Sequence, residues 1–246
     1  NQWHCDMARL ESALAEPKNT LLLLCSPHNP TGKVWRREEL ETMAALCQKH
    51  GVRVISDEIH MDMTWGDHRH IPWSEVAQGP WALFTSGSKS FNIPAFTGAY
   101  GFIPEANCRD SYLQALKARD GLSSPSVPAL LAHIAAYRDG APWLDALRDY
   151  LQENLRFVAD TLNRAFPALR WQPPEATYLA WIDLRPLNID DRALQQALIA
   201  GQKVAIMPGY TYGPEGNGFL RLNVGCPREK LERGVAGLIA ALRSLS

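Results

Sequence analysis

The pattern of apolar and polar positions in the first part of the chain predicts strands that alternate with a helix. The apolar run from Leu21 to Cys25 ends in a cluster of turn-forming residues, Ser26 to Gly32, which is typical of a buried strand that enters a functional loop. Helical spacing follows from Arg36 to His50, and Val52 to Ser56 is the next apolar run. Because the joints are short, these elements predict a βαβ unit with parallel strands and a right-handed crossover.

Two more strands are predicted from Trp81 to Thr85 and from Thr97 to Ile103, and the pattern then becomes mostly helical. Helical spacing predicts segments near 105–119, 126–139, 142–166, 190–201 and 227–243, and two further apolar runs predict strands at 177–184 and 219–224. The Gly140-Ala141-Pro142 joint suggests a domain boundary. We therefore expect residues 1–140 to form part of a large α/β domain with a mostly parallel sheet, and residues 141–246 to form a small α+β domain.

Composition narrows the classes of partner. Lys and Arg number 25 against 26 Asp and Glu, so no basic surplus indicates nucleic acid. The longest apolar stretch, Leu21 to Cys25, is far shorter than the roughly 20 residues that a membrane-spanning helix needs. The five cysteines are far apart and form no CxxC pair, which is typical of reduced cytosolic thiols. We expect a cytoplasmic protein that binds a small molecule.

The chain opens on Asn1 rather than on Met, and the residues from Asn1 to Asp6 show no helix cap. We expect the chain to be a fragment of a longer protein.

One lysine stands among small hydroxyl residues directly after a predicted strand, in the motif Ser86-Gly87-Ser88-Lys89-Ser90. Ligands of parallel sheets gather at the carboxyl ends of the strands. A lysine there can form a Schiff base with a cofactor aldehyde, while hydroxyl and amide groups hold a phosphate. A solvated lysine in a turn is the alternative, and the motif by itself is weak evidence.

Two other motifs follow predicted strands. Asp57, in Ser56-Asp57-Glu58-Ile59-His60, could pair with a cofactor ring nitrogen if it is buried, and it could otherwise cap a helix. Glu58 is interpreted as a scaffold acid and His60 as a neighbour of the ring or a polar residue near the core. Asn29 lies in a loop with two prolines, where its amide could donate to a ring oxygen or simply complete a turn.

Arg221 interrupts the apolar strand from Phe219 to Val224 with a guanidinium suited to bidentate capture of an α-carboxylate, although a strand arginine can also face solvent. The His68-Arg69-His70 segment is interpreted as a surface loop, because no other ligand cluster supports a metal site. Packing roles are expected for Trp65, Trp73, Trp81 and Trp143.

Taken in order, the Asn-Pro loop, the strand-end Asp, the Ser-x-Ser-Lys motif and the strand Arg resemble the pyridoxal 5'-phosphate (PLP) enzymes of aminotransferase class I/II, which have the aminotransferase-like fold (fold type I). The match extends to the MalY/PatB branch of the cystathionine β-lyases, and the enterobacterial MalY type is the most similar. The segments that carry it are Leu22 to Trp35, Ser56 to Met63, Ser86 to Gly101, Asp120 to Ser126 and Met207 to Gly213.

This resemblance implies a lyase that cleaves cystathionine or related cysteine S-conjugates to a thiol, pyruvate and ammonia. It implies a homodimer and, for the MalY type, a second role as a modulator of the transcription activator of the maltose regulon. An aminotransferase and a regulatory binding protein that needs no catalysis are the alternatives.

The resemblance also implies a role for each matching residue. Lys89 would be the Schiff-base lysine and the catalytic base, Asp57 the partner of the pyridine nitrogen, Asn29 and His60 neighbours of the ring oxygen, Ser86 and Ser88 phosphate contacts, and Arg221 the anchor of the substrate carboxylate. Many aminotransferases carry a phosphate-binding Arg eight positions after the lysine, whereas this chain has Thr97.

Family members carry a further N-terminal stretch of about the size of a domain, with a phosphate loop, an aromatic residue against the ring and a tyrosine lent across the dimer. These parts are not in the sequence. We therefore expect the 246 residues alone to expose apolar sheet surface, to bind PLP weakly and to be inactive.

Overall fold

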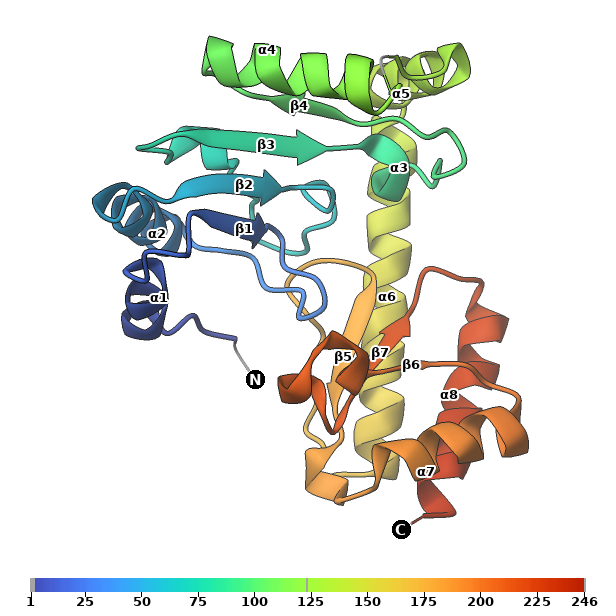
Figure 1. The fold of residues 1–246 in the computed structure, drawn as a ribbon. Coiled ribbons are helices and arrows are strands. Elements are labelled where there is room, and N and C mark those ends of the chain that lie inside the picture. Colours follow the sequence, from blue (N-terminus) through green and yellow to red (C-terminus); the bar gives the residue numbers. More distant parts are fainter. Residues whose placement is uncertain (1–2, 123, 246) are drawn as a thin grey trace. The chain divides into compact units, whose positions relative to one another are not determined.

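The computed structural model describes residues 3–122 and 124–245 (Figure 1). Ser123, within one of the segments that carry the family resemblance, lies outside the described residues. The described residues form two compact units: an N-terminal unit of residues 3–28 and 33–146, and a C-terminal unit of residues 29–32 and 147–245. Each unit is described by itself.

The N-terminal unit is built on a four-stranded sheet in the order β1-β2-β3-β4. The strands are β1 (Leu21–Cys25), β2 (Arg53–Asp57), β3 (Trp81–Thr85) and β4 (Tyr100–Phe102). β1, β2 and β3 are parallel, and β4 joins β3 in the antiparallel direction. In Figure 1 the arrowheads of β1, β2 and β3 point the same way, so their carboxyl ends share one edge of the sheet.

The helices of this unit are α1 (Met7–Leu14), α2 (Arg37–Lys49), the short α3 (Gly87–Ser90), α4 (Ala106–Gln114) with a π-helical continuation at Ala115–Arg119, and α5 (Val127–Asp139). Among them, α2, α4 with its continuation, and α5 lie close to the predicted ranges, whereas α1 and α3 were not predicted. A 3₁₀ turn spans Trp73–Glu75.

The core of the N-terminal unit lies on one face of the sheet, where α1 and α2 pack. Leu24 of β1, Val54 of β2 and Leu83 of β3 meet Leu40 and other apolar residues of α2 there. Trp73 is 2% exposed within this core, which confirms its packing role.

The opposite face of β1 is open, so the strand that was predicted to be buried is buried on one side only. Leu21 is 51% exposed and Leu23 is 69% exposed. Alternate residues of a strand point to opposite faces of a sheet. No helix of the described residues covers these two side chains, whereas Leu24 faces α2 and is buried.

The absence of a helix cap before residue 7 was also a wrong interpretation. Asp6 is the N-cap of α1, and its carboxylate accepts a hydrogen bond from the backbone N–H of Arg9 at 3.0 Å. Asp is among the preferred N-cap residues, because its side chain satisfies an unpaired amide of the first turn. The amphipathic spacing that α1 shows across Met7–Leu14 was not recognised in the sequence.

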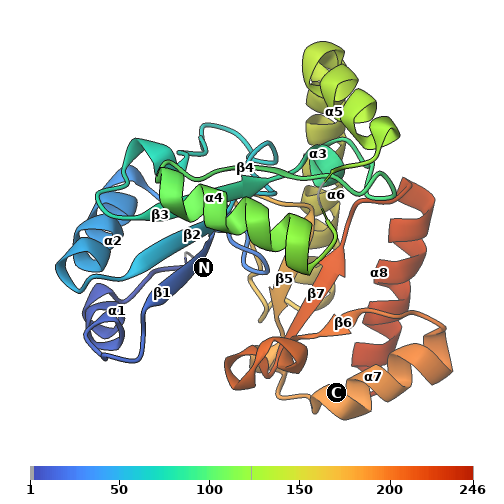
Figure 2. The same cartoon turned by 45° about the horizontal axis from the view of Figure 1, so that its top comes forward.

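The C-terminal unit contains a three-stranded antiparallel sheet in the order β5-β7-β6, formed by β5 (Leu179–Asp183), β7 (Phe219–Asn223) and β6 (Met207–Pro208). Its helices are α7 (Asp191–Gln196), which continues in the π-helical Ala197–Gln202, and α8 (Arg228–Arg243); 3₁₀ turns span Arg185–Leu187, Gly209–Tyr212 and Pro214–Gly216. α8 packs on the Ala197–Gln202 segment (Figure 2). The two-residue strand β6 was not predicted.

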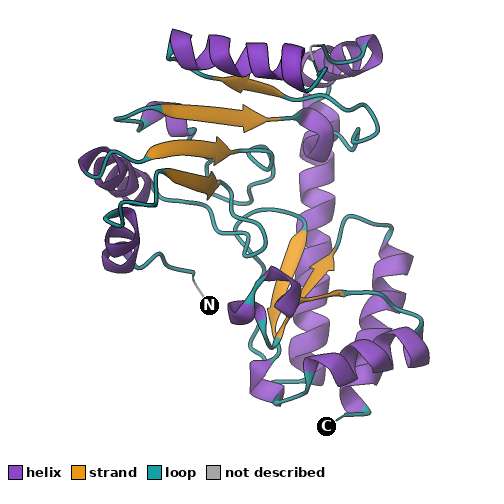
Figure 3. Cartoon of the chain, in the orientation of Figure 1, coloured by secondary structure: helices purple, strands orange, loops and turns teal. Residues whose placement is uncertain are grey.

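The long helix α6 (Ala141–Ala165) begins directly after Gly140. In Figure 3, which has the orientation of Figure 1, it is the long purple helix. It starts in the N-terminal unit and continues in the C-terminal unit, and the division between the units falls after Ala146. The boundary placed at Gly140 stays a prediction. No helix in the described part of the chain combines the length and the apolar character that crossing a membrane would require.

Candidate functional site

The carboxyl edge of the parallel strands holds the first group of predicted site residues. Asp57 is the last residue of β2 and pairs in register with Cys25 of β1 and Phe84 of β3. The backbone N–H of Ser26 donates to the Asp57 carbonyl oxygen at 2.9 Å, and the Glu58 N–H donates to the Phe84 carbonyl oxygen at 2.9 Å. These hydrogen bonds hold the carboxyl ends of β1, β2 and β3 together. The segment that follows β3 therefore starts at the same edge of the sheet as Asp57.

The Asp57 carboxylate is exposed, although its predicted role assumed a buried group. Its Oδ1 accepts a hydrogen bond from the Ile59 N–H at 3.1 Å, which orients the side chain. His60 is 4% exposed. Asp57 is therefore accessible to a ligand, whereas His60 lies in the interior of the N-terminal unit.

Lys89 lies in the last turn of the short helix α3 and is exposed. Its neighbour Ser90 is fully buried, and the Ser90 hydroxyl donates to Oδ2 of Asp62 at 2.7 Å. In the part of the chain that the structure describes, no carboxylate forms an ion pair with Lys89. The buried serine anchors the helix, and the amine of Lys89 is available to react with a carbonyl group.

Glu58 is 1% exposed and lies at the centre of a buried hydrogen-bond network. Its Oε1 accepts from the Ser56 hydroxyl at 2.8 Å and from the Trp73 N–H at 2.8 Å, and its Oε2 lies 2.7 Å from Nε2 of His70. These bonds fix the segment that follows β2, in agreement with the scaffold role predicted for Glu58. The surface-loop interpretation was wrong for His70, because its ring is held against a buried carboxylate and its side chain is only 9% exposed.

Ser86 is the N-cap of α3 and is 4% exposed. Its hydroxyl oxygen accepts from the Ser88 N–H at 3.1 Å, its proton lies toward the Gly98 carbonyl oxygen at 2.7 Å, and Nε2 of His133 is 3.2 Å away. Ser88 is half-buried. Nothing in the sequence identified His133 as a neighbour of Ser86, because it lies on another helix, 47 residues away.

The C-terminal unit brings together the other two predicted residues, Asn29 and Arg221. Nη1 of Arg221 donates to Oδ1 of Asn29 at 3.2 Å. Arg221 lies in the middle of β7, and its guanidinium is 5.0 Å from the ring centroid of Tyr212, in a cation–π arrangement. Among the described residues, no carboxylate forms an ion pair with Arg221. Neutral groups position the guanidinium of Arg221, and no ion pair within the described ranges prevents it from binding an anionic ligand.

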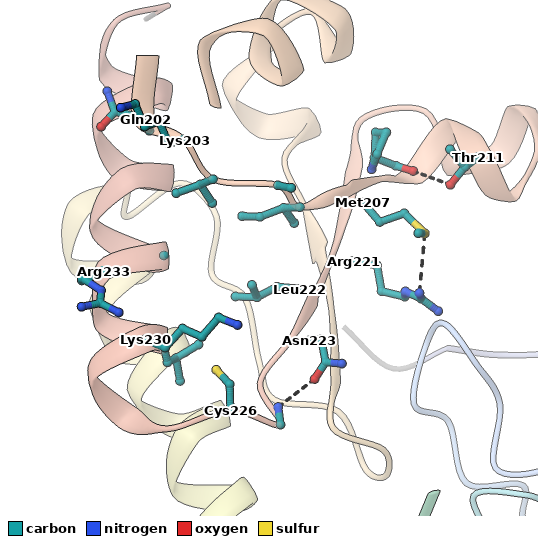
Figure 4. Close-up of a pocket in the computed structure, with 17 residues that line it drawn as sticks. Gln202, Lys203, Met207, Thr211, Arg221, Leu222, Asn223, Cys226, Lys230 and Arg233 are labelled. Carbon is teal, nitrogen blue, oxygen red and sulfur yellow. Dashed lines mark hydrogen bonds between the residues drawn. The ribbon is translucent and has the colours of Figure 1, made fainter. Parts of the chain in front are cut away.

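A cleft of about 850 Å³ borders Arg221 in the same unit (Figure 4). Four basic side chains contribute to its wall, and neither Asp nor Glu is among its lining residues; the basic residues are Lys203, Arg221, Lys230 and Arg233. Gln202, Thr211 and Asn223 add neutral polar groups to the lining, and apolar residues make up much of the rest. A wall of this charge favours a negatively charged ligand.

The functional groups at these sites are an amine, carboxylates, hydroxyls and a guanidinium. Within residues 3–122 and 124–245, no group of three His, Cys, Asp or Glu side chains is arranged to hold a metal ion. None of the five cysteines forms a disulfide bond. An exposed lysine, a strand-end aspartate and clustered hydroxyl groups suit an aldehyde cofactor that carries a ring nitrogen and a phosphate.

Comparison with known proteins supports this assignment. The chain is 71% identical over 243 residues to the protein MalY of Escherichia coli (strain K12), and 38% identical over 240 residues to the cystathionine β-lyase PatB of Bacillus subtilis (strain 168). The alignments cover 99% and 96% of this chain, and 62% of each relative. The chain therefore spans less than two thirds of the length of these relatives. The predicted resemblance to the MalY/PatB branch is confirmed.

Solved structures share the fold. Cystalysin from Treponema denticola, which contains a pyridoxal 5'-phosphate cofactor, matches with a TM-score of 0.91 and 30% identity, over 99% of this chain and 62% of its own. A PLP-bound putative aminotransferase from Clostridium difficile 630 matches with a TM-score of 0.91 and 31% identity, over 98% of this chain and 62% of its own. The predicted fold class, with its mostly parallel sheet and small α+β part, is confirmed. The model of the family aminotransferase class I and II matches residues 1–238, and the chain belongs to this family.

Proposed function

We propose that the natural protein that contains this chain is a PLP-dependent lyase that cleaves the Cβ–S bond of cystathionine or a related cysteine S-conjugate. The products are a thiol, pyruvate and ammonia. The observation that carries the proposal is the placement of an exposed Lys89 and an exposed Asp57 after neighbouring parallel strands. The similarity to a cystathionine β-lyase of Bacillus subtilis supports the choice of substrate class.

The predicted site residues carry the functional groups that binding PLP requires. Lys89 offers a primary amine for the aldehyde, Asp57 a carboxylate for the pyridinium N–H, and Asn29 an amide N–H for the ring oxygen, since Oδ1 of Asn29 already accepts from Arg221. His60 is assigned to the neighbourhood of that oxygen, and Ser86 and Ser88 are assigned to the phosphate. When bound, PLP supplies an electron sink for negative charge at the substrate Cα.

The reaction needs one proton acceptor and one carboxylate anchor from the protein. The amine of Lys89 removes the proton from Cα, and the fork of N–H donors of Arg221 holds the substrate α-carboxylate. Asp57 holds the ring proton by charge pairing. The Cβ–S bond then breaks, its electron pair leaves with sulfur as a thiolate, and the remaining enamine reacts with water to give pyruvate and ammonia.

The test is pyruvate release from cystathionine by the PLP-loaded protein, measured in parallel with free thiol. We expect Lys89→Ala to abolish both products and the control Lys18→Ala, on an exposed turn, to leave both rates unchanged. Absence of pyruvate from the unaltered protein, or its persistence in Lys89→Ala, would refute the proposal.

An aminotransferase is the second candidate, and the similarity to the Clostridium difficile putative aminotransferase favours it. This reaction uses the same lysine but returns the proton to the cofactor carbon. A keto acid formed in a single equivalent, with the cofactor left in its amine form and no thiol released, would decide for transamination.

We extend the proposal to the assembly and the partners. The natural protein is a homodimer in the cytoplasm, and cysteines that form no disulfide bond are compatible with that compartment. The 246 residues alone bind PLP weakly, and the exposed apolar face at Leu21 and Leu23 supports this expectation.

A modulating contact with a transcription activator stays a prediction. Co-precipitation of the activator of the maltose regulon by the unaltered protein and by Lys89→Ala would show whether such a contact exists and whether it needs the chemistry.

A further inference from the structure

His133 of α5 reaches the segment that carries Lys89 through a chain of hydrogen bonds. Its Nδ1 lies 2.8 Å from the Ala129 carbonyl oxygen, and its Nε2 lies 3.2 Å from the Ser86 hydroxyl. The same hydroxyl lies 2.7 Å from the Gly98 carbonyl oxygen. One imidazole therefore joins α5 to the N-cap of α3 and to the loop that follows α3.

Two glycines leave the space that the imidazole ring of His133 occupies. A Cβ atom added at Gly98 would lie 3.3 Å from Cε1 of His133, and one added at Gly87 would lie 3.4 Å from its Cδ2. The Cβ of Ala129 would be 3.2 Å from the added atom at Gly98. The ring is thus enclosed by small residues on both sides, and its orientation toward Ser86 is fixed by packing as well as by hydrogen bonds.

The hydrogen bond between His133 and Ser86 does more than hold the two side chains together, because it affects where the single hydroxyl proton of Ser86 lies. A carbonyl oxygen only accepts, so Nδ1 must donate to Ala129, and in the neutral ring Nε2 is then an acceptor. The Ser86 hydroxyl has a single proton, and Nε2 competes for it with the Gly98 carbonyl oxygen. A ring with protons on both nitrogens would instead donate to Ser86 and leave the hydroxyl proton to another acceptor. The partner of the hydroxyl proton therefore depends on His133.

We infer that His133 is a positioning residue for the cofactor phosphate, and that it acts through the hydroxyl of Ser86. This inference rests on the proposed function, in which Ser86 contacts the phosphate. The side chains of Ser86, Ser88 and Thr97 carry no charge. When Nε2 of the imidazole donates to the Ser86 oxygen, the hydroxyl proton is left for a phosphate oxygen, so the ring then supports the contact between Ser86 and the phosphate.

The test compares two ligands of the natural protein: PLP, and pyridoxal, which lacks the phosphate. Both affinities are measured by absorbance of the cofactor, and the fold is checked by thermal unfolding. We expect His133→Leu to weaken PLP about tenfold, the size of one hydrogen bond to a charged group, and to leave pyridoxal unchanged. We expect His133→Gln, which can still donate to Ser86, to recover most of the loss. The control His68→Leu, on an exposed loop, should affect neither ligand.

A double-mutant cycle shows whether the effect passes through Ser86. If it does, His133→Leu costs little further PLP affinity once Ser86→Ala is present, because the two changes remove one shared contact. Equal weakening of PLP and pyridoxal, no weakening of PLP, or additive losses in the cycle would overturn the inference while leaving the proposed function intact. Failure of the unaltered protein to bind PLP would overturn the proposed function itself.

Discussion

The buried carboxylate of Glu58 allows a quantitative prediction about stability. Glu58 is 1% exposed and accepts hydrogen bonds from Ser56 and Trp73, and it lies 2.7 Å from the ring of His70. In Glu58→Ala these buried polar groups lose their partner together. Each unsatisfied buried group costs about 1–3 kcal/mol, and the Ser56 hydroxyl, the Trp73 N–H and the His70 ring lose their partner in the same variant. We expect Glu58→Ala to lower the free energy of unfolding by about 3–5 kcal/mol.

Glu58→Gln has nearly the same shape and should cost much less. Its Oε1 can still accept from the Ser56 hydroxyl and the Trp73 N–H, and its amide group keeps a polar partner beside Nε2 of His70. The loss is then limited to the charge-assisted part of these bonds, about 1 kcal/mol. The two variants therefore separate the role of the hydrogen bonds from the role of the charge.

The assay is urea unfolding followed by tryptophan fluorescence, with the slope of the transition compared between variants. Glu75→Ala is a matched control, since Glu75 forms an ion pair of 2.6 Å with Arg37 while its side chain is 53% exposed. Water screens such a pair, and we expect the unfolding midpoint to change little. A loss below about 1 kcal/mol for Glu58→Ala, or an equal loss for Glu58→Gln, would refute the reasoning.

Three further predictions concern other buried groups. Burial raises the pKa of the Cys47 thiol to about 11, so iodoacetamide at pH 8 should modify the exposed Cys108 well before Cys47, as followed by mass spectrometry; equal rates would contradict this. Burial lowers the pKa of His28, so the stability that its neutral ring contributes is present above its ordinary pKa of about 6.5 and is lost as the pH falls; His28→Gln should flatten the decline of the melting temperature between about pH 7 and pH 5, and an unchanged decline would count against it. Nδ2 of the fully buried Asn154 donates to the Val224 carbonyl oxygen at 2.9 Å, so Asn154→Leu should cost about 1–3 kcal/mol in urea unfolding, and a neutral result would show that the bond contributes nothing.

Local sequence patterns were sufficient for most elements of the fold. The runs Leu21 to Cys25 and Trp81 to Thr85 are strands with the predicted bounds, and α5 and α8 lie within a residue of their predicted limits. These elements are specified by nearby residues, because apolar spacing and turn formers act over a few positions. The helix α1 was missed, although Asp6 caps it through a bond of only three residues' separation.

Burial was predicted less well, because it depends on elements far away in the sequence. The apolar run from Leu21 to Cys25 predicted a buried strand, yet Leu23 is 69% exposed because no described helix covers it. Conversely, the polar segment around His70 suggested solvent, yet Glu58 draws its ring into the interior. The polarity of a side chain does not predict whether residues distant in the sequence will cover it or bond to it in the folded protein.

The sequence by itself determined the candidate chemistry: Lys89, Asp57, Asn29 and Arg221 stand out by residue type, by their order and by their positions within or shortly after strands. Tertiary structure alone decided which atoms meet. Arg221 binds the amide of Asn29 across 192 residues, and the imidazole of His133 reaches the Ser86 hydroxyl across 47. Hydrogen bonds of this kind are fixed by where sheets and helices pack, and spacing along the chain carries no record of that packing.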